Sequence, residues 1–294
     1  MSVAIVGTGL MGRAVAERLK SCGYEVVAYN RTREKAEPLT RQGIAVVGTV
    51  AEAVTSAQVV LLLLSDAAAI RAVLAADGVA AGLRGRLIVQ MGTISPNESR
   101  EIEQQIHAAG GEYIEAPVLG SIAEAKKGTL LVMIGGSAER FARLTPVLNH
   151  LCDAPVLVGS VGQAAAMKLA LNQLIASHIA AFSLSLALLQ RSGVSVEIFR
   201  ELLAKSTLAP PMFEKKYPRI ASHDYANPNF SVRMLLKDVR LVHEAAEQAG
   251  VDARSLDGIA PLLERGIALG YGDQDYAALY EAVASAPDVE QPGR

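Results

Sequence analysis

A glycine-rich turn near the N-terminus constrains the fold of this chain more than any other feature. The apolar run Val3–Val6 leads into Gly7-Thr8-Gly9-Leu10-Met11-Gly12, and a helical pattern continues from Gly12 to Cys22. In such a G-x-G-x-x-G turn the first glycine permits the turn, the second opens the backbone to a pyrophosphate, and the third lets helix and strand pack closely. Because the turn opens a region of alternating strand and helix patterns, it predicts a Rossmann-type unit. A plain strand–helix turn is the alternative interpretation.

The first half of the chain alternates between short apolar runs and helical patterns. One run, Val59–Leu64, is apolar on both faces, as is typical of a central parallel strand covered by helices. Ser95-Pro96-Asn97-Glu98 indicates a helix start, with a capping serine, a proline at the first position and a glutamate three residues on. Strands are expected at Val3–Val6, Glu25–Tyr29, Ile44–Val47, Val59–Leu64, Leu87–Gln90, Tyr113–Glu115, Leu130–Ile134 and Val156–Val158, with helices near Gly12–Cys22, Glu98–Ala109 and Glu139–Leu148.

After Gly159 the pattern predicts helices and no strand. Gly250 and Gly270 stand just past two expected helix ends, where a left-handed residue often closes a helix. We therefore predict a Rossmann-type α/β domain over residues 1–162 and an all-α domain over 163–294, joined by a long interdomain helix. The expected helices are Ala164–Gln190, Ser195–Ala204, Ser231–Gln248, Ala253–Leu269 and Asp275–Ala284.

Composition narrows the classes of protein. A formal net charge of −2 argues against a general attraction to nucleic acid or to anionic membranes. The two cysteines, Cys22 and Cys152, have no metal-ligand spacing, so no metal site is expected, and such sparse cysteine suits a reducing cytoplasm. The first residues have no basic segment or cleavage site, so we expect no signal peptide. The apolar stretch Leu174–Leu189 is shorter than the roughly 20 residues a membrane span needs, which favours a buried core helix.

The residues after the second expected strand indicate which dinucleotide binds. An NAD enzyme usually has an acidic residue there, which binds the ribose 2′-hydroxyl. This chain has Asn30-Arg31-Thr32 and no carboxylate, and Arg31 can pair with a 2′-phosphate while Asn30 and Thr32 donate hydrogen bonds. The pattern favours NADPH over NADH. A solvated basic helix start is the alternative.

Lys168 and Asn172 stand four residues apart in a helical pattern and therefore share one helix face. The residues around them are apolar, and burying a lysine costs free energy unless it has an oppositely charged partner or a functional role. From the pattern alone, a lysine whose long stem reaches water is an equally good interpretation.

At this point the chain resembles the β-hydroxyacid dehydrogenase family, which includes 3-hydroxyisobutyrate dehydrogenases and glyoxylate or succinic semialdehyde reductases. The resemblance covers nearly the whole chain, and it is specific through the order and spacing of its motifs. Beyond the glycine-rich turn and Asn30-Arg31-Thr32, these are Met91-Gly92-Thr93-Ile94-Ser95-Pro96, Ala116-Pro117-Val118-Leu119-Gly120-Ser121, Lys126-Lys127-Gly128-Thr129-Leu130, Gly159-Ser160-Val161-Gly162 leading to Lys168 and Asn172, Leu236-Lys237-Asp238, and Gly272-Asp273-Gln274-Asp275.

The resemblance implies an NADPH-dependent enzyme that moves a hydride between nicotinamide and a small aldehyde, keto acid or hydroxy acid. It implies that Lys168 is the general acid or base and that Asn172 positions the substrate. It also implies pairing of the α domains into homodimers or homotetramers. The other implied site residues are Gly120 and Ser121, whose backbone would bind a substrate carboxylate, Thr93 near the nicotinamide, Lys237 close to the cofactor, and Leu64 and Ser65 near the adenosine half.

Three positions depart from the family's pattern. Leu119 stands where the substrate loop usually has serine, which removes a hydroxyl donor to a carboxylate and puts a small hydroxy acid substrate in doubt. Gly92 replaces a frequent serine, and Ser65 a frequent proline. Two other functions share this fold: an imine reductase, which usually has another residue at the position of Lys168, and a non-catalytic scaffold, which would be expected to lack the lysine.

Overall fold

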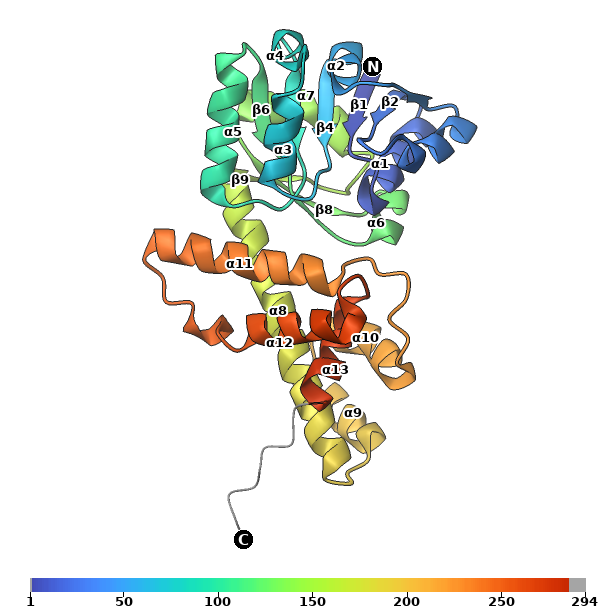
Figure 1. Ribbon diagram of the computed structural model, residues 1–294, viewed down its shortest axis with the longest axis vertical. Coiled ribbons are helices and arrows are strands. Elements are labelled where there is room, and N and C mark those ends of the chain that lie inside the picture. The colour runs from blue at the N-terminus through green and yellow to red at the C-terminus, as the bar shows by residue number, and fades with distance from the viewer. Residues whose placement is uncertain (1, 286–294) are drawn as a thin grey trace. The chain divides into compact units, whose positions relative to one another are not determined.

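The computed structural model describes residues 2–285. The chain separates into two compact units, and the boundary falls between Leu169 and Ala170, seven residues beyond the boundary that we expected. The first unit is an α/β domain and the second is helical, as the sequence predicts (Figure 1). Each unit is described by itself.

Six parallel strands form the main sheet of the first unit, in the order β3-β2-β1-β4-β5-β6. This is the order of a doubly wound dinucleotide-binding fold. All six correspond to expected strands, so the predicted Rossmann-type unit is confirmed. Their bounds are β1 (Ser2–Val6), β2 (Glu25–Tyr29), β3 (Ala45–Val46), β4 (Val59–Leu62), β5 (Leu87–Gln90) and β6 (Glu112–Glu115).

Three further strands extend this sheet beyond β6. β8 (Leu131–Gly135) runs antiparallel to β6 and to the two-residue β7 (Val118–Leu119), and β9 (Val156–Gly159) lies parallel to β8. The sequence predicts β8 and β9. It does not predict β7, because two residues are too few to show an alternation.

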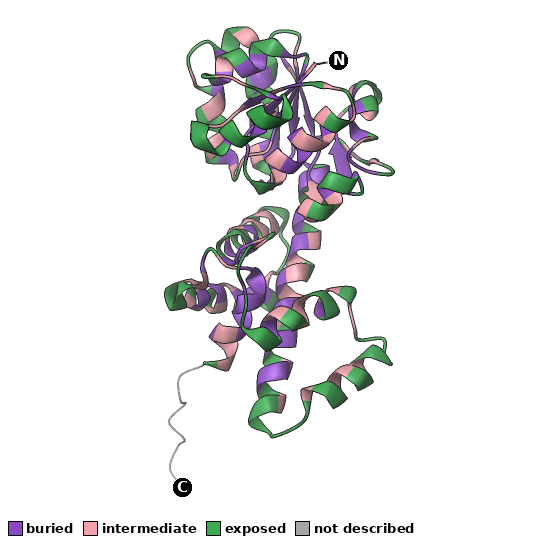
Figure 2. Ribbon diagram, turned by 90° about the vertical axis from the view of Figure 1, so that its right-hand side faces the viewer, coloured by how far each residue is buried: buried purple, intermediate pink, exposed green. Residues whose placement is uncertain are grey.

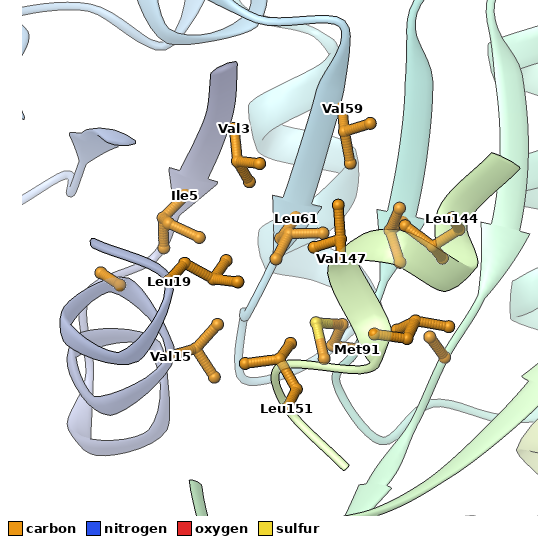
Figure 3. Packing of buried hydrophobic residues seen from close by; sticks show 14 of the residues in the cluster. Val3, Ile5, Val15, Leu19, Val59, Leu61, Met91, Leu144, Val147 and Leu151 are labelled. Carbon is orange, nitrogen blue, oxygen red and sulfur yellow. The ribbon is translucent and has the colours of Figure 1, made fainter. Parts of the chain in front are cut away.

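Helices cover both faces of the sheet. Alternate residues of β1 point to opposite faces: Val3 and Ile5 pack with α1, α6 and α7, whereas Ala4 and Val6 pack with α2 to α5. Figure 3 shows the first of these layers, in which side chains of β1 and β4 lie against those of α1 and α7. The helices are α1 (Leu10–Ser21), α2 (Val50–Ser56), α3 (Ala67–Leu74), α4 (Val79–Gly82), α5 (Pro96–Ala108), α6 (Ile122–Lys127) and α7 (Ala138–Leu148), with short 3₁₀ helices η1 (Arg33–Lys35) and η2 (Glu37–Gln42).

The second unit packs its helices around one apolar core. The rings of Phe182 and Phe213 stack with centroids 4.2 Å apart, and Leu235 and Leu263 are fully buried beside them. Gly250 ends α11 in the left-handed conformation, as the sequence predicts. The elements are most of α8 (Gln163–Arg191), then α9 (Val196–Ala204), α10 (Pro211–Ser222), α11 (Val232–Ala249), η3 (Arg254–Leu256), α12 (Ile259–Gly266), the π-helical η4 (Ile267–Tyr271), η5 (Tyr276–Ala278) and α13 (Leu279–Ala284).

Prolines explain where the expected helices of this unit were wrong. α10 was not expected, because it begins at Pro211 and contains Pro218. The single helix expected over Ala253–Leu269 is instead η3, α12 and part of η4. Pro261 has no N–H and its ring would clash with the carbonyl four residues earlier, so a regular helix can start only a turn before it.

Helix α8 is buried along only one of its faces. By length and composition alone it could cross a membrane, and 39% of its most apolar window is buried within the protein. Ile179 and Phe182 are buried, whereas Leu184 and Leu188 are 62% and 63% exposed. Figure 2 shows buried, intermediate and exposed segments along the helices of this unit. The expected core helix therefore also presents an apolar face that residues 2–285 do not cover.

Candidate functional site

The glycine-rich turn has the backbone that the sequence predicts. Gly7 has φ of +99°, and its N–H donates to Tyr29 O at 2.9 Å. A Cβ at Gly7 would overlap the carbonyl of Leu63, and one at Gly12 would overlap the carbonyl of Gly7. A Cβ at Gly9 would meet no atom within 4 Å, so this position is open on the side where a ligand can approach.

The cofactor residues expected from the sequence gather at one edge of the first unit. Gly7 follows β1, Asn30 follows β2, Leu64 follows β4 and Thr93 follows β5, so all lie beyond the carboxyl ends of parallel strands. Ligands of doubly wound sheets bind in the crevice outside these strand ends. The asparagine has a definite structural task there: Asn30 Oδ1 accepts the Thr8 N–H at 3.0 Å and joins the β1 and β2 ends.

The segment after β2 leaves Arg31 available to a ligand. Asn30 Nδ2 donates to Thr32 O at 2.9 Å, which shapes the turn that carries Arg31. Arg33 pairs with Glu37 at 3.3 Å in an exposed salt bridge. Arg31 is exposed, and no ion pair within residues 2–285 involves it.

Two of the departures from the family's pattern have structural reasons. A Cβ at Gly92 would overlap the carbonyl oxygen of Leu64, so a serine does not fit here without a shift. Ser65 donates to Asp66 Oδ2 at 2.8 Å, while Asp66 Oδ1 accepts the Ala69 N–H at 2.7 Å and caps α3. Ser65 thereby supports the cap of the helix that follows β4.

Together these observations fit a dinucleotide. The open backbone at Gly9 begins α1, whose first N–H groups receive no side-chain cap within the described residues. A helix N-terminus of this kind favours a phosphate group, and the adjoining strand ends carry the other expected cofactor residues.

The expected substrate loop joins β7 to α6. Leu119 ends β7, and Gly120 is exposed with φ of +144°. Ser121 caps α6 together with Glu124: the Ser121 N–H donates to Glu124 Oε2 at 2.8 Å, and its hydroxyl also donates to this oxygen. The N–H that we expected to bind a substrate carboxylate is thus hydrogen-bonded within the chain.

A buried carboxylate holds the start of helix α8. Glu115 is 1% exposed, and its Oε1 accepts the N–H groups of Gly162, Ala164 and Ala165 at 2.8, 2.8 and 3.1 Å. Its Oε2 accepts the hydroxyl of Ser99. Burial raises the pKa of Glu115 above its ordinary value, and these hydrogen bonds offset part of that rise. This residue therefore anchors the helix that carries Lys168.

Lys168 and Asn172 lie one turn apart on helix α8 and are 8% and 2% exposed. Asn172 Nδ2 donates to Asp238 Oδ2 of α11 at 2.5 Å, which leaves Asn172 Oδ1 buried without a hydrogen-bond partner in residues 2–285. Lys237 Nζ lies 2.8 Å from Asp238 Oδ1 and forms an ion pair with it. The angles at these two atoms are not those of a hydrogen bond. The second unit thus brings together Asn172, Lys237 and Asp238.

Sequence reasoning did not assign two of these residues to the site. Asp238 was noted only as a neighbour of Lys237, and Glu115 only as the end of a strand. A signal for Glu115 exists, since in the expected strand Tyr113–Glu115 it follows two large hydrophobic residues, and acids in buried strands usually have a partner. The partner itself, 47 to 50 residues away, cannot be read from the sequence.

Comparisons with known proteins agree with this geometry. Residues 2–193 match the model of the NAD binding domain of 6-phosphogluconate dehydrogenase, and residues 162–283 match that of the NAD-binding of NADP-dependent 3-hydroxyisobutyrate dehydrogenase. The chain is 30% identical to glyoxylate/succinic semialdehyde reductase 1 of Arabidopsis thaliana, over 96% of this chain and 98% of that protein.

Solved structures show the same architecture. The 3-hydroxyisobutyrate dehydrogenase of Salmonella typhimurium superposes with a TM-score of 0.85 at 25% identity, covering 96% of this chain and 99% of that one. An imine reductase from Myxococcus stipitatus in complex with NADP+ shares the fold with a TM-score of 0.67 at 24% identity, over 96% of this chain and 100% of that one. From the strand order, the glycine-rich turn and these matches, the chain belongs to the β-hydroxyacid dehydrogenase family and is an NAD(P)-dependent oxidoreductase.

Proposed function

We propose that this protein uses NADPH to reduce a small carbonyl compound, or NADP+ to oxidise the matching alcohol. The substrate range that the family indicates is short aldehydes and keto acids such as succinic semialdehyde or glyoxylate, and 3-hydroxyisobutyrate-like acids in the oxidative direction. The observation that carries this proposal is the buried Lys168, one helical turn from an asparagine whose orientation is fixed by Asp238.

Lys168 is the proton donor of the proposed reaction. When bound, the nicotinamide supplies a hydride to the carbonyl carbon, and negative charge develops on the carbonyl oxygen. The Lys168 ammonium gives this oxygen a proton, and in the oxidative direction its neutral amine accepts the proton of the alcohol. The anchoring of the start of α8 by Glu115 keeps the lysine in position while charge develops.

Asn172 positions the substrate. Its amide nitrogen is committed to Asp238, so the carboxamide cannot turn over, and Oδ1 is left as the acceptor. A buried acceptor without a partner is costly, and a substrate hydroxyl would satisfy it. Lys237 completes this group near the cofactor, and its pairing with Asp238 holds the carboxylate in place.

NADPH is the proposed cofactor because of the segment after β2. Arg31 is exposed there and has no acidic neighbour in an ion pair among the described residues, so it can pair with a 2′-phosphate. The remaining contacts are proposed for Gly7, Thr8, Gly9, Leu10, Met11, Gly12, Asn30, Thr32, Leu64, Ser65 and Thr93, and for Gly120 and Ser121 with Leu119 on the substrate side.

We also propose that the protein acts as a homo-oligomer in the cytoplasm. Leu184 and Leu188 on α8, and Ile198 and Leu202 on α9, each stand four residues apart and are 58–63% exposed. Exposed apolar rows on two consecutive helices favour an interaction with another chain. A second copy of this chain is the occupant we propose, because the same two rows can pack against themselves across a twofold axis.

The proposed chemistry is tested by a cofactor-consumption screen of aldehydes, keto acids and cyclic imines, followed by substitution of Lys168. Removal of a positioned proton donor typically costs about 10²- to 10⁴-fold in rate, so Lys168→Ala should lower kcat by that factor with NADPH affinity nearly unchanged. Lys168→Arg should restore little, since guanidinium stays protonated near neutral pH.

Circular dichroism and NADPH binding serve as controls, because loss of a merely structural lysine would lower activity by unfolding the helix. A folded, NADPH-binding Lys168→Ala variant with near-normal turnover would refute the mechanism. Turnover of imines alone would support an imine reductase, and NADPH binding without turnover of any of these compounds would support a non-catalytic scaffold.

A further inference from the structure

The loop proposed to hold the substrate's anionic group already contains an anion of its own. Glu124 Oε2 accepts the Ser121 N–H at 2.8 Å and also the Ser121 hydroxyl. Ser121 Oγ in turn accepts the Ala123 N–H at 3.2 Å. Both donors that Ser121 could offer to a substrate carboxylate are therefore engaged by a carboxylate of the protein.

The glutamate lies across the loop rather than in free solvent. Glu124 is half-buried, and a Cβ placed on Gly120 would lie 3.3 Å from Glu124 Cβ, so the side-chain stem lies beside the exposed glycine. A substrate carboxylate at this point would have to displace Glu124 or bind beside a like charge. Both alternatives weaken binding, since like charges brought together across an interface are strongly unfavourable.

The rest of the loop surface is apolar. Leu119 pairs in register with Leu131 on the antiparallel strand β8. Directly opposite residues of an antiparallel pair place their side chains on one face of the sheet, so the two leucines adjoin. Leu131 is 62% exposed and Leu119 is half-buried, which gives this part of the loop an open hydrocarbon surface.

From these contacts we infer that the substrate presents an uncharged group, and not a carboxylate, to residues 119–121. Glu124 engages both donors of Ser121, and Leu119 with Leu131 offers apolar contact in place of a hydroxyl. The inference rests on the proposed function and narrows its substrate range: aldehydes and ketones whose far end is neutral are the better substrates, and keto acids and semialdehydes the poorer ones.

The experiment compares two substrates that differ only in charge. Succinic semialdehyde and its methyl ester share the same reacting carbonyl, and kcat/KM for each is measured with NADPH for the full-length protein. The ester should be preferred by about tenfold or more, which corresponds to one charged hydrogen-bonding contact. In Glu124→Gln the ester-to-acid ratio should fall by about tenfold or more, mainly through a lower KM for the acid. Glutamine retains an oxygen for the Ser121 N–H, so the cap of α6 survives.

A matched control removes the same charge from another helix cap. Glu52 accepts the N–H groups of Gly48 and Thr49 at the start of α2, so Glu52→Gln changes a capping glutamate in the same way outside the substrate loop. Its ester-to-acid ratio should equal that of the unaltered protein. An equal fall in both variants would attribute the effect to net charge and overturn the inference.

A binding measurement judges the inference without relying on turnover. Butyrate has the length of the semialdehyde but no reactive carbonyl, and its affinity for the NADP+-loaded protein is measured by calorimetry. Binding to Glu124→Gln should be about tenfold or more tighter than to the unaltered protein. Equal butyrate affinity, or a wild-type preference for the acid over the ester, would overturn the inference. If the unaltered protein turns over neither carbonyl compound but butyrate binds more tightly to Glu124→Gln as predicted, only the proposed reaction is overturned.

Discussion

Replacement of Glu115 by alanine should destabilise the first unit more than any exposed substitution would. The change leaves three N–H groups at the start of α8, now 2.8 to 3.1 Å from Glu115 Oε1, without their acceptor. It also removes one of the two hydrogen-bond partners of the Ser99 hydroxyl, the other being Tyr113. A buried donor without a partner costs about 1–3 kcal/mol. Water can reach some of these groups once the side chain is gone, so we expect a loss of about 3–5 kcal/mol in the free energy of unfolding.

Glu115→Gln separates the geometry of the carboxyl group from its charge. The glutamine oxygen can replace Oε1, and its NH₂ can donate to a turned Ser99 hydroxyl, so the loss should be about 1 kcal/mol. Urea and thermal unfolding of the full chain, followed by circular dichroism, measure both variants. For a unit of this size about 2–4 °C accompanies each kcal/mol, so the alanine variant should unfold about 6–20 °C lower. An alanine variant within 1 kcal/mol of the unaltered protein would refute the anchoring role.

Comparison of Glu115→Gln with the unaltered protein should show a pH dependence of stability with a definite sign. Burial raises the pKa of Glu115 above its ordinary 4.5, so the folded protein binds this proton more tightly than the unfolded chain does. The stability that this carboxyl contributes is fully present below pH 4.5 and is lost as pH rises through the raised pKa. Glu115→Gln carries no such proton. Its stability relative to the unaltered protein should therefore improve as pH rises above 4.5, and a fall over this range would contradict the sign.

Three further predictions concern the cofactor, the substrate loop and the assembly. NADPH should bind more tightly than NADH, and Arg31→Ala should reduce the ratio of the two affinities by about tenfold or more, because it removes a charged contact to the 2′-phosphate. Equal affinity of the unaltered protein for both cofactors would refute the assignment of NADPH. Leu119→Ser should lower KM for carboxylate-bearing substrates, and the double variant with Glu124→Gln should lower it further; a gain confined to uncharged aldehydes would show that the loop holds no carboxylate in either form. Leu188→Glu should shift the protein towards the monomer in analytical ultracentrifugation, and an unchanged mass would argue against the α8 face as the contact between copies.

Local patterns were enough to predict the architecture of the first unit. The glycines at 7, 9 and 12 act through the backbone of their own turn, and the alternation of apolar runs with helical patterns follows from the side-chain period of each element. The helix caps are also formed by residues close in sequence: Ser95 with Glu98 begins α5, and Gly250 ends α11. The Ser121–Glu124 cap is equally local, three residues apart, and its S-x-x-E spacing could have been read from the sequence.

Contacts between distant residues depended on the tertiary structure alone. Glu115 meets the start of α8 from 47 to 50 residues away, and Asp238 meets Asn172 from 66 residues away. Several acids could in principle cap α8 or hydrogen-bond Asn172. Only the packing of strands and helices decides which carboxylate lies within reach. The sequence by itself therefore determined the six parallel strands of the first unit and the place of the cofactor turn. The tertiary structure decided which buried charges hold Lys168 and Asn172, because a costly buried charge is tolerated only where the fold brings it hydrogen-bond partners.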